Sequence, residues 1–327
     1  MLAVTGATGQ VGGRVAARIA GLGLDQRLIV RDPERAPDLP GAGIVKVSSY
    51  GDFPAMRRAL SGVTTLFLVS ARDRFGVAHI CAKTGERLPQ YDRLQQHLAA
   101  LRAAEEAGVK HVVYLSVINP APDAIFVLAR DHFHTEEYIR NSGMQFTILR
   151  TGLYTDNVPQ CVSSDDVIRA PSGEGRSAWV TRDDIADATV AVLTGCRKEG
   201  CTYDLTGPEA LTMAETAERL SAAVGRPISY QAQTAEEARI TRSTSRLEKF
   251  EAERRLLTGH GLDDYEVEVF VTHFLQIAAG VLENVSDAFY SLCGRTATSL
   301  AEYLWRHPES CLHLNRGSRF PSRSGRH

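Results

Sequence analysis

A cluster of glycines near the start of the chain constrains the fold more than any other feature. Gly6, Gly9 and Gly12 lie within VTGATGQVGGRVAARI, residues 4–19. A short apolar run at residues 2–5 comes before them. Apolar residues then recur with the spacing of one helix face, at Val11, Val15 and Ile19. The segment therefore predicts a strand, a tight turn and a helix.

A G-x-x-G-x-x-G turn in this context is suited to the pyrophosphate of a dinucleotide. Glycine adopts positive φ without strain, and a backbone without Cβ lets phosphates approach closely. The helix then offers free N–H groups and a positive dipole end. We predict cofactor binding by the loop residues Gly6, Thr8, Gly9, Gln10, Val11 and Gly12. A turn with a purely structural role is the alternative.

Short apolar runs alternate with helical patterns through the first half of the chain. Further strands are expected at residues 27–30, 44–47, 64–70, 111–116 and 145–150. They are almost continuously apolar, as is typical of strands buried on both faces. Helices are expected at about residues 91–107 and 130–141, each followed by a glycine. The alternation predicts an α/β fold with a Rossmann-type, doubly wound parallel sheet.

Helix-capping patterns mark the second half of the chain. They pair Thr181 with Asp184, Thr212 with Glu215, and Ser299 with Glu302. We expect an NAD(P)-binding Rossmann domain over residues 1–155 and a smaller, helix-rich substrate-binding region over residues 156–308, which partly contributes back to the sheet. Residues 309–327 are basic and rich in Gly, Ser and Pro, and are expected to be a disordered tail. An arm that binds nucleic acid is the alternative for that tail.

Composition narrows the functional classes. The formal net charge of −2 gives no electrostatic reason to expect nucleic acid as a partner. No apolar run approaches the roughly 20 residues that a membrane helix needs. The six cysteines contain no C-x-x-C pair, so neither a zinc site nor a disulfide framework is expected. We expect a cytoplasmic protein that binds a small molecule and no metal; a homodimer stays open.

The end of the second predicted strand bears on the choice of cofactor. Arg31 stands where an NAD-specific site usually places an acid for the ribose hydroxyls, and an arginine suits the 2′-phosphate of NADP. Asp32 follows directly and keeps NADH open. The sequence therefore favours NADPH.

Longer motifs resemble one known family. They are VTGATGQVGGRVA and VRDPERA near the start, ARDHFHTEEYIRNSGMQFTILRTGLYTDN (129–157), WVTRDDIADATVAVLTG (179–195) and TYDLTGPEALTMAETAERL (202–220). They are similar to the NmrA-like, atypical short-chain dehydrogenase/reductases, and most of all to the triphenylmethane and type 2 quinone reductases among them. The resemblance implies a Rossmann half that binds NADP(H), no flavin, and flat conjugated electrophiles as substrates.

The Tyr-x-x-x-Lys pair of short-chain dehydrogenases falls at Leu128 and His132. The resemblance carries over His132, with Glu136 or Glu137, but no catalytic tyrosine. His132 is the catalytic candidate, either holding the nicotinamide or protonating the product near neutral pH, and a packing role is the alternative. Without a tyrosine acid, a quinone is an easier acceptor than a ketone, because a phenol-like oxygen has a pKa of about 10.

Positions at the carboxyl ends of parallel strands supply the other site candidates. Ser70 and Ser116 are expected near the cofactor, and Tyr154 and Asn157 in the substrate wall, with a capping aromatic as the alternative for Tyr154. Two segments look longer than is usual in the family. Residues 74–91 are either a substrate lid or a surface insertion, and residues 239–257 are either a solvated helix or an oligomer contact.

These features predict an NADPH-dependent reductase of a quinone or another flat conjugated electrophile. Two alternatives stay open. One is a non-catalytic, NADP(H)-sensing regulatory protein, which would bind the cofactor without turnover. The other is a tailoring reductase or isomerase of aromatic natural products.

Overall fold

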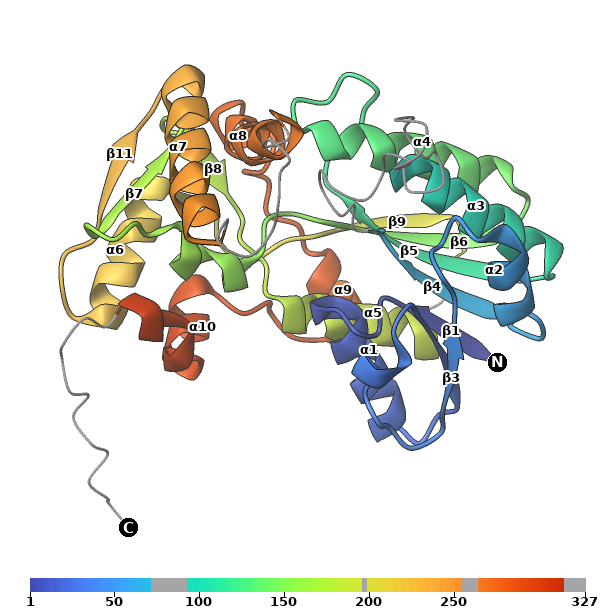
Figure 1. Ribbon diagram of the computed structural model, residues 1–327. Helices are drawn as coiled ribbons and strands as arrows, with labels where there is room; N and C mark the ends of the chain where they lie inside the picture. Colours follow the sequence, from blue (N-terminus) through green and yellow to red (C-terminus); the bar gives the residue numbers. More distant parts are fainter. Residues whose placement is uncertain (72–92, 196–198, 254–263, 315–327) are drawn as a thin grey trace, which may run out of the picture.

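A seven-stranded parallel sheet is the centre of the larger half of the molecule (Figure 1). The computed structural model describes residues 1–71, 93–195, 199–253 and 264–314. The strands, in spatial order, are β3 (Ala42–Lys46), β2 (Gln26–Val30), β1 (Leu2–Thr5), β4 (Thr65–Val69), β5 (His111–Val117), β6 (Gln145–Thr151) and β9 (Cys201–Leu205). The chain starts at β1 in the middle of the sheet, adds β2 and β3 on one side, and then crosses over to add β4 and the later strands on the other side. Ligands bind at such a switch point between β1 and β4. The predicted Rossmann-type sheet is confirmed.

Helices cover both faces of this sheet. One face carries α1 (Gln10–Gly21) and α5 (Arg182–Thr194), and the other carries α2 (Phe53–Ala59), α3 (Arg93–Glu106) and α4 (Val127–Asn141). Successive side chains of β5 point to opposite layers. Val113 and Leu115 pack with α1 and α5, whereas Val112 and Tyr114 pack with α3 and α4. This alternation decides which strand-end residues can face the site.

The strand at the sheet edge differs from its prediction. Its apolar pattern predicts burial on both faces, but Ile44 is 44% exposed. β3 has one neighbouring strand, β2, so it lies outside the double helical cover that buries the central strands. At the opposite edge, β9 is a strand that the apolar runs do not predict, because Thr202 and Asp204 interrupt its pattern.

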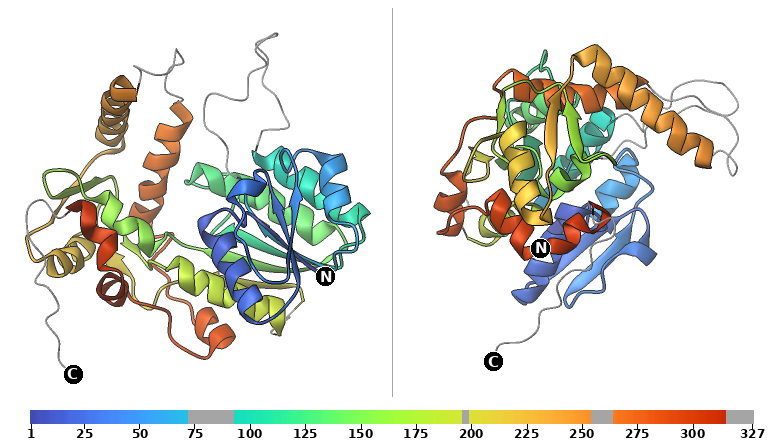
Figure 2. Two further views of the ribbon diagram at one scale, coloured as in Figure 1. Left: turned by 60° about the horizontal axis from the view of Figure 1, so that its bottom comes forward. Right: turned by 90° about the vertical axis from the view of Figure 1, so that its left-hand side faces the viewer.

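The rest of the chain forms a smaller unit with its own core. β7 (Val167–Ala170) pairs with β11 (Ser229–Ala232), and β8 (Arg176–Ser177) pairs with β10 (Leu211–Thr212). The helices that belong to this unit are α6 (Met213–Val224), α7 (Ala235–Glu253), α8 (Asp264–Ala278) and α10 (Leu300–Arg306). Trp179, Leu220, Phe274 and Leu304 belong to its apolar core. Helix α7 contains residues 239–253 of the charged stretch 239–257, and residues 254–257 lie outside the described residues. The helix extends away from the body in the right view of Figure 2.

Three elements from beyond residue 155 return to the larger half. β9 pairs with β6, and α5 packs beside α1 in Figures 1 and 2. α9 (Ala288–Cys293) adds Phe289 to the same core. The predicted caps are confirmed at all three helices: Thr181 caps α5, Thr212 and Glu215 form a capping box at α6, and Ser299 caps α10.

The predicted disordered tail, residues 309–327, overlaps an ordered segment at its start. Residues 308–314 form the 3₁₀ helix η4 (Pro308–Leu314), and Cys311 and Leu314 are buried in the core of the smaller unit. Their apolar side chains outweigh the basic composition that predicted disorder. Residues 315–327 lie outside the described residues, as does the segment 74–91. Within the described ranges, no helix has both the length and the apolar character to span a membrane.

Candidate active site

A largely apolar cavity of about 180 Å³ lies at the carboxyl ends of β4, β5 and β6. The larger half contributes Ser70, Arg93, Val117, Ile118, Phe126, Leu128, His132, Thr151, Gly152, Leu153 and Tyr154 to its wall. The smaller unit adds His273 and Gln276 from α8, and Leu282 follows that helix. The cavity therefore lies where the two halves meet. Both positions of the expected Tyr-x-x-x-Lys pair, Leu128 and His132, face it from α4.

The glycine loop has the geometry expected of a phosphate cradle. Gly6 has φ of +64°, and the Gly9 amide donates a 2.8 Å hydrogen bond to the Gly6 carbonyl. A Cβ on Gly12 would overlap the carbonyl oxygen of Gly6, so no side chain fits there. In the described structure no side chain caps the N-terminus of α1. Its N–H groups are thus available to an anion, and the loop fits a dinucleotide pyrophosphate.

The two charged residues after β2 have different roles. Asp32 caps the short helix η1 (Pro33–Arg35), since its Oδ1 accepts a 3.2 Å hydrogen bond from the Glu34 amide. Arg31 is exposed. The carboxylate is therefore used locally, whereas the guanidinium faces solvent beside the adenosine end expected of the site.

His132 is held between two side chains. Its Nε2 lies 2.6 Å from Nη2 of Arg93, and its Nδ1 lies 2.7 Å from the Tyr114 hydroxyl. A guanidinium only donates, so Nε2 accepts and Nδ1 carries the proton toward Tyr114. Burial, together with the neighbouring Arg93, holds the pKa of His132 well below its usual range. This argues against His132 as a proton donor near neutral pH.

A second buried histidine stands behind the first. The Ala71 amide donates to Nε2 of His97 at 2.8 Å, and Nδ1 of His97 lies 2.9 Å from Oγ1 of Thr135. Thr135 in turn donates to the carbonyl of Asp131 at 2.6 Å. Burial lowers the pKa of His97 well below its usual range, so this ring is neutral too. Through its hydrogen bonds to Ala71 and Thr135, His97 of α3 connects the residues after β4 to α4.

Arg93 is the site residue that the sequence reasoning missed. Its side chain is 6% exposed and lines the cavity. The carbonyls of Ala71 and Leu128 and the carboxylate of Asp131 each accept a hydrogen bond from it at 3.1 Å. It carries the single formal charge among the described lining residues, which include no Asp or Glu. An arginine near the start of a predicted helix is expected to face solvent, and no pattern in the neighbouring sequence predicts that Arg93 is buried.

Ser116 is not brought to the cavity. Its hydroxyl donates to Oε1 of Glu136 at 2.6 Å, on the α4 side of the sheet, and the next residue, Val117, lines the cavity instead. Glu136 is 2% exposed and also accepts hydrogen bonds from Arg150 at 2.7 Å and Arg140 at 3.0 Å. The expected cofactor contact of Ser116 thus conflicts with its placement. Of the two glutamates, Glu136 is the one buried in this network; Glu137 is exposed, and its carboxylate lies 3.5 Å from Nδ1 of His134.

Of the two residues predicted for the substrate wall, Tyr154 lies at the cavity and Asn157 does not. Tyr154 lines the cavity, and the guanidinium of Arg182 lies 4.6 Å from its ring centroid. Asn157 is exposed and is not among the described lining residues, and its Oδ1 accepts a 2.9 Å hydrogen bond from Arg182. Asn157 therefore supports Arg182, which in turn packs on Tyr154.

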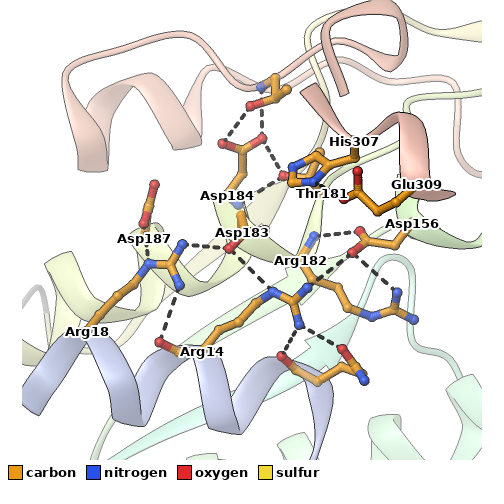
Figure 3. A network of polar contacts seen from close by, with 12 residues as sticks. Arg14, Arg18, Asp156, Thr181, Arg182, Asp183, Asp184, Asp187, His307 and Glu309 are labelled. Carbon is orange, nitrogen blue, oxygen red and sulfur yellow. Dashed lines mark hydrogen bonds and ion pairs between the residues drawn. The ribbon is translucent and has the colours of Figure 1, made fainter. Parts of the chain in front are cut away.

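Ion pairs join the phosphate-binding helix to α5 (Figure 3). Arg14 lies 3.3 Å from Asp183, and Arg18 reaches Asp183 at 2.7 Å and Asp187 at 2.6 Å. Asp156, from the 3₁₀ helix η3 (Thr155–Cys161), lies 3.8 Å from Arg14. The motif at 179–195 thus holds α1 in place beside the glycine loop.

Comparison with known proteins agrees with this geometry. Residues 6–195 match the model of a family described as NAD(P)H-binding. Over 238 residues the chain is 34% identical to quinone oxidoreductase 2 of Escherichia coli strain K12, covering 71% of this chain and 77% of the relative. Over 313 residues it is 29% identical to an NAD(P)H azoreductase of Xenophilus azovorans, covering 94% and 98%.

Solved structures show the same architecture over nearly the whole chain. The NADPH complex of the E. coli NADPH-dependent quinone oxidoreductase gives a TM-score of 0.77 at 28% identity, covering 94% of this chain and 99% of that one. Citrobacter sp. triphenylmethane reductase complexed with NADP(H) gives 0.75 at 27% identity, with the same coverage. The chain therefore belongs to the NAD(P)H-binding family, and it is an oxidoreductase related to the NmrA-like quinone, azo and triphenylmethane reductases.

Proposed function

We propose that the protein is an NADPH-dependent reductase that transfers hydride to a neutral or anionic conjugated acceptor, with quinones as the leading class. One observation carries this proposal: the apolar cavity contains a buried guanidinium, Arg93, and no carboxylate among its described lining residues. Such a wall suits an acceptor that becomes negatively charged during the reaction.

The cofactor site follows from the glycine loop and the strand ends. Gly6, Gly9 and Gly12 would hold the pyrophosphate at the N-terminus of α1. Arg31 would pair with the 2′-phosphate, and Ser70 on the cavity wall would lie beside the nicotinamide. NADPH supplies the hydride when bound. Two structural relatives are described as complexes with NADPH or NADP(H), which supports the same cofactor here.

Arg93 would stabilise the product as its charge forms. Hydride addition to a quinone leaves a negative oxygen, and a fixed guanidinium in an apolar cavity stabilises such a charge without giving up a proton. Its three oxygen acceptors hold it in one orientation. His132 acts as a further support, since its Nε2 accepts from Nη2. The hydroquinone anion then takes its proton from water, because its pKa of about 10 lies above neutral pH.

The charge of the wall also selects among acceptors. A cationic dye would bring a second positive charge close to Arg93 in surroundings of low dielectric constant, where repulsion is stronger than in water. We therefore propose that neutral quinones are preferred to the cationic triphenylmethane dyes that one relative is named for.

A non-catalytic NADP(H) sensor is the second candidate. It is favoured by Leu128, which lines the cavity where the reductases of this broad class carry a tyrosine hydroxyl. One assay separates the two. The loss of reduced-nicotinamide absorbance is measured with NADPH and NADH against a neutral quinone and a cationic dye. Quinone-dependent loss with NADPH supports the reductase. Tight NADPH binding without consumption by any acceptor would instead support the sensor.

A further inference from the structure

A second cavity of about 160 Å³ adjoins the first, and Phe126 and Gln276 belong to the walls of both. Asn119, Asp123 and Ala124 come from the segment after β5, Ala129 from α4, and Val281 from the residues after α8. Because the two side chains are shared, they form the partition between the cavities.

Only 4% of Gln276 is exposed, and its side-chain amide lines both cavities and makes no hydrogen bond to another residue within the described ranges. An amide on a cavity wall loses contact with water when a ligand enters, so a ligand that offers it a hydrogen bond is favoured over one that does not. Its amide can both donate and accept. The position between two cavities makes a bound molecule the natural partner.

The rest of the partition is apolar and held in place. The ring of His273 meets the ring of Phe126 edge to face, with centroids 5.4 Å apart. The hydroxyl of Thr272 accepts a 3.5 Å hydrogen bond from the Val127 amide, which fixes α8 against the start of α4. Gln276 therefore projects from a helix that is positioned against the wall opposite it.

The size of the first cavity leaves room for little more than one ring. A cavity of about 150 Å³ holds one benzene molecule. A fused bicyclic acceptor, or one with a side chain, exceeds this volume, and the second cavity is the adjoining space past Gln276 that can hold the excess. That cavity has a polar wall: Asn119 supplies an amide, and Asp123 supplies an exposed carboxylate that accepts hydrogen bonds.

We propose that the second cavity is a substrate subsite for a side chain that donates hydrogen bonds, such as a hydroxyalkyl group, and that Gln276 selects acceptors carrying one. This inference rests on the proposed reductase function. The reacting ring occupies the cavity beside Arg93, the substituent passes Phe126, and its donor group is held by the Gln276 amide oxygen.

The test compares two naphthoquinones that differ in one hydroxyl, one with a hydroxyethyl chain and one with an ethyl chain. We expect the wild type to favour the hydroxyethyl compound about tenfold in kcat/KM, the effect of one hydrogen bond. Gln276→Leu should bring the ratio of kcat/KM for the hydroxyethyl compound to that for the ethyl compound from about ten down to about one. Gln160→Leu, at an exposed glutamine outside both cavities, is the matched control.

Equal kcat/KM for the two compounds in the wild type would overturn the subsite, as would an equal loss on both in Gln276→Leu. A second measurement separates this outcome from a failure of the reductase proposal. Calorimetry in the presence of NADP⁺ gives the Kd of two non-reducible naphthalenes with the same hydroxyethyl and ethyl chains. If these differ while no quinone is reduced, the subsite stands and the reductase falls. If quinones are reduced and neither pair is distinguished, the reductase stands and the subsite falls.

Discussion

The guanidinium of Arg93 and the imidazole of His132 lie 2.6 Å apart, Nη2 to Nε2, on the wall of the cavity. The histidine accepts and stays neutral, so the charge at this wall belongs to the arginine. Catalysis of the proposed reaction should then depend on a fixed cation and not on a titrating acid.

Replacing Arg93 by methionine removes the charge and keeps most of the volume. We expect kcat with a neutral quinone to fall about a hundredfold, as when one oxyanion donor is lost, with a small change in KM. Arg93→Lys should retain more activity, because its charge remains. Steady-state kinetics gives the answer once circular dichroism has shown both variants to be folded. Full activity in a folded Arg93→Met would remove Arg93 from the mechanism.

Arg31→Asp tests the cofactor assignment. An acid in place of the arginine repels the 2′-phosphate and accepts from ribose hydroxyls. We expect KM for NADPH to rise about tenfold or more, and KM for NADH to stay level or fall. Asp32→Asn is the control, since its carboxylate caps η1 and should matter little to either cofactor. An unchanged NADPH preference in Arg31→Asp would place the 2′-phosphate elsewhere.

Two glycines of α1 form a matched pair for testing the phosphate cradle. Gly12→Ala forces a methyl group onto the carbonyl oxygens of Thr5 and Gly6, so NADPH binding should be lost or strongly weakened. A methyl group on Gly21 meets no atom within 4 Å, and Gly21→Ala should stabilise the helix by about 0.5–1 kcal/mol without affecting NADPH. Fluorescence titration and thermal unfolding measure the two effects. Normal NADPH affinity in Gly12→Ala would contradict the proposed cradle.

Glu136→Gln should destabilise the fold. The substitution leaves Arg150 and Arg140 without a carboxylate at 2.7 and 3.0 Å. Breaking a fully buried pair costs about 3–5 kcal/mol, but both arginines are partly exposed, so we expect about 2 kcal/mol. Urea denaturation measures it, and the exposed Glu137→Gln should change the free energy of unfolding by less than about 0.5 kcal/mol. Equal stability of the two variants would rule out this role for Glu136.

Stability should fall as the pH drops below about 6.5, the usual pKa of an unfolded histidine. Burial lowers the pKa of His97 and His132 well below that value, and that of His273 to about 4. The unfolded chain therefore binds protons that the folded chain does not, and each histidine contributes up to about 1.4 kcal/mol per pH unit in that window.

Urea denaturation at a series of pH values checks this, with His273→Phe as the test variant. Its free energy of unfolding should fall less steeply with decreasing pH than that of the wild type. His134→Asn removes a histidine whose side chain is 48% exposed, and its profile should match the wild type. Identical slopes in all three proteins would show that His273 keeps its ordinary pKa in the folded state.

The fold was predictable because its signals are local. Gly6, Gly9 and Gly12 specify the turn by their backbone needs, and apolar runs separated by capped helices specify a parallel sheet. Strand β9 was not predicted, because polar residues interrupt its apolar pattern. Strand β3 is less buried than its apolar pattern predicts, because it lies at the edge of the sheet.

The site was predictable only in part, since it is assembled from distant segments. The resemblance placed Leu128 and His132, and the strand ends placed Ser70 and Tyr154, all of which line the cavity. Ser116 lies outside the described cavity lining, because the alternation of β5 turns its side chain toward Glu136 of α4 and leaves Val117 at the cavity. Arg93 and Gln276 come from α3 and α8, and no local pattern relates them to the glycine loop.

The return of β9 and α5 to the larger half has a consequence for biosynthesis. A nascent chain that has emerged only as far as residue 155 has an unpaired β6 edge and an uncovered apolar face on α1, because the segments that cover them have yet to be made. Because α9 also contributes Phe289 to this core, the nucleotide-binding half can reach its native state on the ribosome only after residue 293 has left the exit tunnel. Until then its unpaired strand edge invites association with other chains, and chaperones are the expected protection.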